Sequence, residues 1–88
     1  MMIIELGTYC SDVDVQMQAI KEINTLTSEY TNPIDVNGLC NNYIVIKSLS
    51  MHPTEANDFV INLVTLIQTR KYLDHYYFNE VTINRDKL

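Results

Sequence analysis

Apolar residues follow two rhythms along this chain, one of period two and one of about 3.6 residues. The period-two stretch around which the chain is organised runs from Asn42 to Met51. As a strand it would send Tyr43, Val45, Lys47, Leu49 and Met51 to one face, and Ile44, Ile46, Ser48 and Ser50 to the other. Because both faces are mostly apolar, we predict a central strand with helices on one face and partial cover on the other.

One long segment with the helical rhythm precedes this strand. Over residues 12–30 the apolar side chains fall in a single wide stripe, and Asp14, Glu22 and Glu29 fall on the opposite side. Ser11 has a side chain preferred at an N-cap, and Asp14 three positions later completes a motif that resembles a capping box. We therefore predict a helix with an acidic outer face.

A second helical segment follows the central stretch. It begins at His52-Pro53, because proline suits the first helical position. Apolar residues cover more than half of its circumference, and Arg70 and Lys71 stand in its last turn, where the helix dipole favours cations. This helix is predicted to be deeply packed.

Two further segments of period two lie near the ends of the chain. Residues 2–6 predict a first strand, which Gly7 and Thr8 would end. Residues 76–84 predict a last strand toward an edge of the sheet, with Tyr77 and Val81 on one face and Phe78 on the other.

The connection between the first helix and the central strand contains a hairpin signal. Residues 34–36 favour a short strand, and Asn37-Gly38 after them is the strongest hairpin-turn dipeptide. Asn41-Asn42 is a second possible turn, which leaves two registers open. If the short strand does not form, the sheet is smaller by one strand.

The predicted order is strand, helix, strand, strand, helix, strand, in a chain of 88 residues. Right-handed crossovers leave few topologies for that order. We predict a single α+β domain over residues 1–88, a small two-layer sandwich with two helices on one face of a mostly antiparallel sheet, in ferredoxin-like β-α-β-β-α-β order. This arrangement leaves the second sheet face open, and a large exposed apolar face usually meets a partner.

Charge is distributed unevenly along the chain. The net charge is −5, and all of it falls on residues 1–42, where six acids face Lys21 alone. Clustered Lys and Arg are missing, which argues against direct binding to nucleic acid or to an anionic membrane. An acidic half favours a basic protein partner, with solubility as the simpler explanation.

Candidate chemical groups are few and scattered. Cys10 lies between a strand and a helix start, where a thiolate is stabilised, but no Cys-x-x-Cys spacing accompanies it. Cys10, Cys40, His52 and His75 lack the spacing of zinc ligands, and two glycines cannot build a phosphate or dinucleotide loop. We therefore predict a non-enzymatic protein without metal or cofactor, with Cys10 chemistry as the enzymatic alternative.

The most unusual composition lies between residues 72 and 78. Four aromatic residues and a histidine occur there, namely Tyr72, His75, Tyr76, Tyr77 and Phe78. Because aromatic residues are enriched at interface centres, we predict a partner or dimer interface in this segment. Packing of part of the segment into the core is the alternative.

Together these features favour a protein–protein interaction module that forms a homodimer through the open sheet face or the aromatic segment. We expect it to offer an acidic face, formed by Asp14, Glu22, Glu29 and Asp35, to a larger protein with a basic surface. Nine Asn and ten Ile suggest AT-rich coding, which fits a phage- or mobile-element-encoded inhibitor of a nucleic-acid-acting protein. The alternative is a small-molecule-binding regulatory domain that works as a dimer.

The sequence also bears on location. The apolar run at residues 1–4 is short and lacks a basic region, and no run approaches the roughly 18 apolar residues of a membrane span. Since the two cysteines are isolated, we expect the cytoplasm of the source or host cell.

Overall fold

A computed structural model describes residues 1–40 and 42–84 of the chain, and of Tyr72 the backbone only. In chain order the elements are β1 (Met2–Thr8), α1 (Val13–Thr27), β2 (Asp35–Leu39), β3 (Tyr43–Ser48), α2 (Pro53–Thr69), the 3-10 helix η1 (Lys71–Leu73) and β4 (Tyr76–Ile83). Within these described residues, no helix is both long and apolar enough to cross a membrane.

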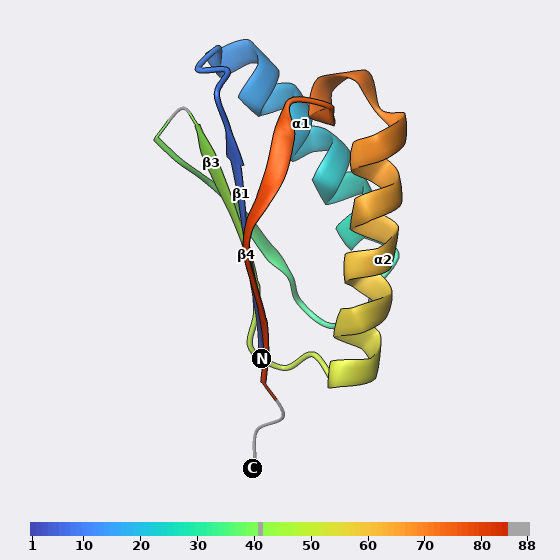
Figure 1. The fold of residues 1–88 in the computed structure, drawn as a ribbon. Helices are drawn as coiled ribbons and strands as arrows, with labels where there is room; N and C mark the ends of the chain where they lie inside the picture. Colours follow the sequence, from blue (N-terminus) through green and yellow to red (C-terminus); the bar gives the residue numbers. More distant parts are fainter. Residues whose placement is uncertain (41, 85–88) are drawn as a thin grey trace.

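The four strands form one sheet in the order β2-β3-β1-β4, and every neighbouring pair is antiparallel. Both helices lie on the same face of this sheet (Figure 1). The α+β class predicted from the sequence is therefore confirmed. β1 lies inside the sheet between β3 and β4, and β2 and β4 form the two edges.

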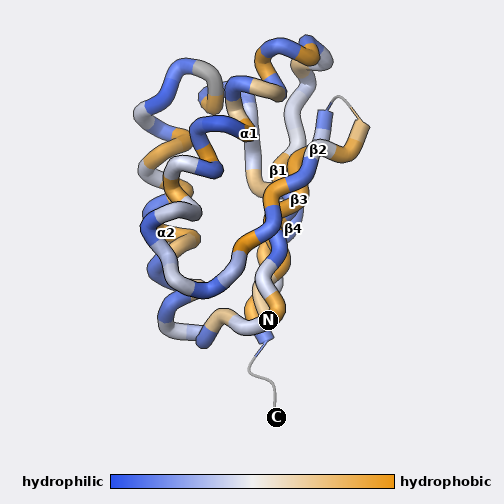
Figure 2. The backbone as a smooth tube through the Cα atoms, turned by 180° about the vertical axis from the view of Figure 1, so that it is seen from behind, coloured by the Kyte–Doolittle hydropathy of each residue, from blue (hydrophilic) through white to orange (hydrophobic). Residues whose placement is uncertain are grey.

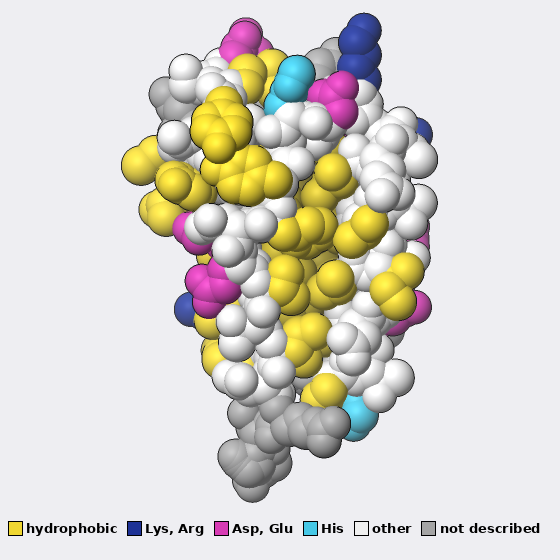
Figure 3. Space-filling model, viewed as in Figure 1, with side chains coloured by type: hydrophobic (Ala, Val, Ile, Leu, Met, Phe, Trp, Pro, Cys, Tyr) yellow, Lys and Arg dark blue, Asp and Glu magenta, His cyan; other side chains and the backbone are white. Residues whose placement is uncertain are grey.

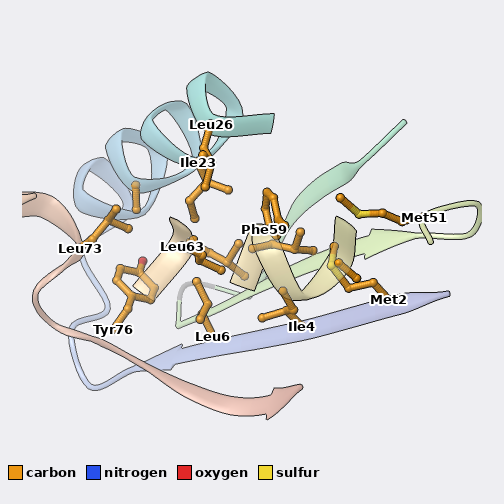
Figure 4. Close-up of a cluster of buried hydrophobic side chains, with 14 residues drawn as sticks. Met2, Ile4, Leu6, Ile23, Leu26, Met51, Phe59, Leu63, Leu73 and Tyr76 are labelled. Carbon is orange, nitrogen blue, oxygen red and sulfur yellow. The ribbon is translucent and has the colours of Figure 1, made fainter. Parts of the chain in front are cut away.

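The core lies between the sheet and the two helices. Met2, Ile4 and Leu6 of β1 point toward the helices, where Phe59 and Leu63 of α2 meet them (Figure 4). The other buried apolar residues are Ala19, Ile23, Leu26, Ile44, Ile46, Met51, Ala56, Leu73 and Tyr76. Burying a large apolar side chain contributes about 1.5–3 kcal/mol, so this layer is what holds the helices on the sheet.

β1 is longer than the sequence predicted. Gly7 and Thr8 continue the strand rather than ending it, because Gly7 pairs with Tyr43 on one side and with Tyr77 on the other. The strand ends where the hydroxyl of Thr8 accepts a hydrogen bond of 3.1 Å from the backbone N–H of Cys10.

α1 is shorter at both ends than predicted. Its N-cap is Asp12, whose carboxylate accepts a hydrogen bond of 2.8 Å from the backbone N–H of Asp14, so the expected cap at Ser11 is wrong by one residue. At the other end, the hydroxyls of Thr27 and Ser28 donate to backbone carbonyls of the last turn. Such bonds compete with the helical ladder and favour its termination.

The β2–β3 hairpin turns at residues 40–42, so the predicted turn at residues 37–38 is wrong. β2 continues through Asn37 and Gly38 because α1 packs against the strand at this point. A Cβ on Gly38 would lie 3.0 Å from Oε1 of Gln16 on α1, so the glycine lets the helix side chain approach closely. The second possible turn, at residues 41–42, coincides with the observed one, although its first residue is outside the described residues.

β4 lies at an edge of the sheet, as predicted, but its side chains do not alternate strictly. Its pairing with β1 shifts between Phe78 and Glu80, which leaves Asn79 as the extra residue of a β-bulge. As a result Phe78 shares the helix side of the sheet with Val81, and Tyr77 shares the other side with Glu80. The prediction that Tyr77 shares a face with Val81, and that Phe78 lies on the other face, was therefore wrong.

α2 begins as predicted. Pro53 is its first residue, and Nδ1 of the N-cap His52 accepts a hydrogen bond of 3.2 Å from the backbone N–H of Thr54. Its last turn holds no cation: Arg70 is the C-cap and Lys71 belongs to η1, which corrects the predicted end of the helix.

Candidate functional site

The sheet face opposite the helices is not covered by any element of the described chain (Figure 1, Figure 2). The strand register shows which side chains belong to it, because partners across an antiparallel pair share a face. They are Asp35, Asn37, Leu39, Tyr43, Val45, Lys47, Ile3, Glu5, Gly7, Tyr77, Glu80 and Thr82. We call this surface the open face.

Three tyrosines gather around Gly7 at one end of the open face. Tyr43 and Tyr77 are the partners of Gly7 on the two neighbouring strands, and the ring centroids of Tyr9 and Tyr77 are 5.5 Å apart. A Cβ on Gly7 would lie 2.9 Å from both Cζ and Oη of Tyr77, so the Tyr77 ring lies directly over the Gly7 backbone. We call Tyr9, Tyr43 and Tyr77 the tyrosine cluster.

The tyrosine cluster is accessible to a partner. Tyr9 is 94% exposed, Tyr77 is 39% exposed, and Tyr43 is half-buried. Desolvation, followed by the neighbouring Tyr9 and Tyr43, raises the pKa of Tyr77 above its ordinary value. Aromatic side chains with an exposed hydroxyl can both stack and form hydrogen bonds, which is why interfaces are rich in tyrosine.

Two carboxylates lie beside the tyrosine cluster. Glu5 and Glu80 are directly opposite each other in the β1–β4 register, and like charges in such a pair destabilise a sheet. Glu5 accepts a hydrogen bond from the side-chain amide of Asn79, and Glu80 accepts one of 3.0 Å from the hydroxyl of Thr82. Neither carboxylate forms an ion pair with the described residues. In the sheet register both carboxylates belong to the open face.

The predicted aromatic interface is divided between the two faces of the sheet. Tyr77 points to the open face, whereas Tyr76 is only 5% exposed and belongs to the core, with Phe78 packed against that core. His75 is exposed, and the side chain of Tyr72 lies outside the described part of the chain. A partner interface over this whole segment stays a prediction, and the structure brings one of its residues, Tyr77, into the tyrosine cluster.

The predicted acidic face is spread over two sides of the molecule. Asp14 and Glu29 are exposed near opposite ends of α1. Oε1 of Glu22 lies 3.5 Å from Nε of Arg70, so this acid is already paired within the chain. Asp35 is on β2 and belongs to the open face. Binding through these four residues stays a prediction, and α1 offers less free charge than its sequence suggested.

The remaining chemical groups do not converge. His52 caps α2, Cys40 occupies the hairpin turn with a φ of 60°, and Cys10 is a half-buried free thiol. Among the described residues, no three His, Cys, Asp or Glu side chains are grouped as metal ligands would be. The Tyr76 hydroxyl is buried without a hydrogen-bond partner in the same residues, and burial, together with the nearby Cys10, raises its pKa.

Sequence reasoning missed most of this site. Tyr9 lies outside the strands, and no spacing along the chain links it or Glu5 to Tyr77. One signal was available at Gly7, because a glycine inside an apolar strand often marks the close approach of another group. Tyr43 was assigned correctly to the same face as Val45, without a role.

No protein-family model, curated protein or solved structure matches this chain.

Proposed function

We propose that this chain is a non-enzymatic protein–protein interaction module that binds a larger protein with a basic surface through its open face. The observation that carries this proposal is the tyrosine cluster beside the carboxylates of Glu5 and Glu80, which form no ion pair among the described residues. A surface that combines exposed rings with free negative charge suits a partner that supplies both apolar contact and cations.

Arginine is the side chain that fits this surface best. Its planar guanidinium stacks on aromatic rings and forms bidentate hydrogen bonds with carboxylates, whereas lysine offers a point charge. Tyr77 lies opposite Gly7, and Glu5 is two residues along β1 on the same face, a step of roughly 7 Å at the usual strand rise. One extended arginine side chain can therefore contact a ring and a carboxylate together.

A partner of this kind is typical of proteins that act on nucleic acids, because they present clustered Arg and Lys. The net charge of −5 would steer such an encounter. We extend the proposal to an inhibitor, of the kind a phage or mobile element encodes, that occupies a basic cleft in the cytoplasm of the source or host cell. The free thiols of Cys10 and Cys40 suit a reducing compartment.

We also propose that the fold is of the ferredoxin-like, split β-α-β kind. The support is the element order together with the interleaving of the two β-α-β units. β3 lies between β1 and β2, the strands of the first unit, and β1 lies between β3 and β4, the strands of the second.

A titration with short peptides tests the binding proposal. An arginine-rich peptide should shift the NMR signals of Tyr9, Tyr43 and Tyr77, and should bind more tightly than a lysine peptide of the same length. Added salt should weaken the binding, because exposed charges are screened. Equal affinity for the two peptides, with shifts spread over the whole surface, would contradict stacking on the tyrosine cluster.

Two matched variants test whether the peptide binds at the open face or near the acidic residues of α1. Glu80→Gln and Glu29→Gln each remove one negative charge, but only Glu80 lies beside the tyrosine cluster. We expect Glu80→Gln to weaken the arginine peptide about two- to fivefold, since an exposed ion pair contributes up to roughly 1 kcal/mol, and Glu29→Gln to change it less. Equal losses would indicate non-specific attraction, and a larger loss with Glu29→Gln would move the site to α1.

A further inference from the structure

We propose that a second copy of this chain pairs with the free edge of β4, so that two sheets join across a two-fold axis. β4 has eight residues and lies at the edge of the sheet, with no strand beyond it among the described residues. This contact uses the backbone edge of β4 and the helix side of the sheet, whereas the proposed function uses the opposite face, so the inference goes beyond that function.

The hydrogen bonds at the end of β4 show which backbone groups point outward. The backbone nitrogen of each of Met1 and Asn84 bonds the carbonyl oxygen of the other, at 3.3 and 2.9 Å. Bonded and non-bonded pairs alternate along an antiparallel ladder, so the N–H and C=O groups of Val81 and Ile83 point away from β1. A row of such groups on an edge is a template for another strand.

Hydrophobic side chains border this edge, in the strip between β4 and α2 that is visible in Figure 3. The β1–β4 register places Phe78, Val81 and Ile83 on the helix side of β4. Helical spacing places Val60, Val64 and Ile67 along one side of α2, away from the side on which Asp58 and Asn62 meet Tyr30, and we assign these six residues to the strip. All are partly exposed, and Val81 is 42% exposed although it lies on the helix side of the sheet. We call these six residues the neutral strip.

Within α2 and β4, the two elements that form the neutral strip, few residues are charged. α2 has only two charged residues, Glu55 and Asp58, and both are engaged toward the chain that follows α1, with Asn32 and Tyr30 respectively. Glu80 is the only charged residue of β4, and it belongs to the open face. Interface cores are depleted of charge in the same way.

The symmetry of an edge contact, together with the lack of charge in the neutral strip, favours a second copy as the occupant. Each chain carries a net charge of −5, so two copies repel wherever their acidic surfaces meet. The neutral strip is a surface on which two copies can approach without placing their carboxylates against one another. An antiparallel β4–β4 contact is also self-complementary, since the same residues serve on both sides of a two-fold axis.

The two edge strands, β2 and β4, differ in length and in exposure, and β4 is the better template for pairing. β2 has five residues, four of them exposed, and includes Asp35 and Gly38, which is how an edge is protected from pairing. β4 has eight residues, and although it contains a β-bulge at Asn79 and one charge, Glu80, its residues 81–83 beyond them form a regular and uncharged edge. A β4–β4 dimer therefore buries the vulnerable edge and leaves the two β2 edges outside.

The mass of the full chain in solution tests this inference. Light scattering should give twice the 10.2 kDa chain mass as concentration rises. Val81→Lys, which puts a charge in the neutral strip, should raise the dimer dissociation constant at least about tenfold. Met17→Lys makes the same kind of change at a 63% exposed residue of α1 and should leave the dimer intact. Val64→Lys repeats the test from the α2 side if the β4 variant does not fold.

A wild-type chain that is monomeric at every concentration overturns the inference, and so does a dimer that survives both strip substitutions. Hydrogen exchange then locates the contact. The amides of Val81 and Ile83 should exchange more slowly as concentration rises, whereas the amide of Thr82, which faces β1, should be slow throughout. Exchange at Val81 and Ile83 that does not depend on concentration would contradict a paired edge.

The effect of salt on affinity distinguishes the dimer from peptide binding at the open face. Screening should leave the dimer unchanged or strengthen it, because two chains of like charge meet. The same salt should weaken the arginine peptide on the open face. A dimer that salt dissociates would count against the neutral strip, whatever the peptide does.

Discussion

Gly7 controls the geometry of the tyrosine cluster because the Tyr77 ring occupies the space where a Cβ would lie. We expect Gly7→Ala to leave the free energy of unfolding within about 1 kcal/mol of wild type, because the exposed ring can swing aside and alanine restricts the unfolded chain. The contact between the Tyr9 and Tyr77 rings should be lost, and the arginine peptide should bind more weakly. Ring-to-ring NOEs and a peptide titration measure both effects.

A double substitution provides the control for Gly7. In a Tyr77→Ala background there is no ring to displace, so adding Gly7→Ala should not weaken the peptide further. A further loss in that background would show that Gly7 acts through something other than Tyr77.

Tyr76 carries a buried hydroxyl that costs stability, since no described residue bonds it. We expect Tyr76→Phe to keep or raise the free energy of unfolding at neutral pH, by up to about 1 kcal/mol. Burial raises the pKa of Tyr76 above the unfolded value of 10.0. As pH rises from that value toward the folded pKa, the unfolded chain loses the proton first and wild-type stability falls. Tyr76→Phe should reduce this alkaline slope in urea unfolding curves.

Tyr30 is the matched control for Tyr76. Its hydroxyl donates to Oδ2 of Asp58 at 2.9 Å and accepts from the amide of Asn62 at 2.8 Å. Tyr30→Phe should therefore lower the free energy of unfolding at neutral pH by about 1 kcal/mol. If the two substitutions had the same effect, the Tyr76 hydroxyl would have a partner after all.

At the scale of elements, Gln16 fastens α1 to the β2–β3 hairpin. Its amide donates to the backbone carbonyls of Cys40 and Tyr43 at 2.9 and 3.0 Å. We expect Gln16→Leu to lower the free energy of unfolding by about 1–3 kcal/mol, because both carbonyls lose their donor. Gln18→Leu is the control, since Gln18 is on the same helix without a side-chain hydrogen bond among the described residues. Equal losses of stability from the two substitutions would mean that the two hydrogen bonds of Gln16 do not stabilise the fold.

The elements that sequence reasoning placed correctly depend on close neighbours in the chain. The alternation of Met2, Ile4 and Leu6 predicted the buried face of β1, and Pro53 predicted the start of α2. The predictions of turns and of strand faces were wrong where contact with an element distant in the chain determines the local structure. Gly38 stays within a strand because Gln16 packs on it from α1, which no local dipeptide preference can reveal.

The candidate site was predicted only in part, for the same reason. Tyr77 was among the aromatic residues singled out, but the bulge at Asn79 sets which face it occupies, and the bulge exists only when β4 meets β1. Glu5 and Tyr9 become neighbours of Tyr77 through that pairing. A surface assembled from both ends of the chain has no signature in residue spacing.

At the scale of the whole molecule, the proposed binding at the open face would use a pair of like charges that lowers the stability of the sheet. Glu5→Gln removes one member of the like-charged pair with Glu80, while its amide oxygen can still accept from Asn79. We expect this variant to raise the free energy of unfolding by about 0.2–1 kcal/mol and to weaken the arginine peptide. Denaturant titration and peptide binding measure the two effects. If Glu5→Gln instead destabilised the chain, its charge would serve the fold and not a partner.

The position of β1 also sets when the chain can fold. β1 is made first, yet it lies between β3 and β4, and its Met2 pairs with Ile83 at the far end of β4. Closing so long a loop is slow compared with forming local helical contacts. During synthesis, β1 therefore lacks one of its two neighbouring strands until β4 has left the ribosome. We therefore expect the sheet to be completed late, with the β4 side of β1 unpaired until that step.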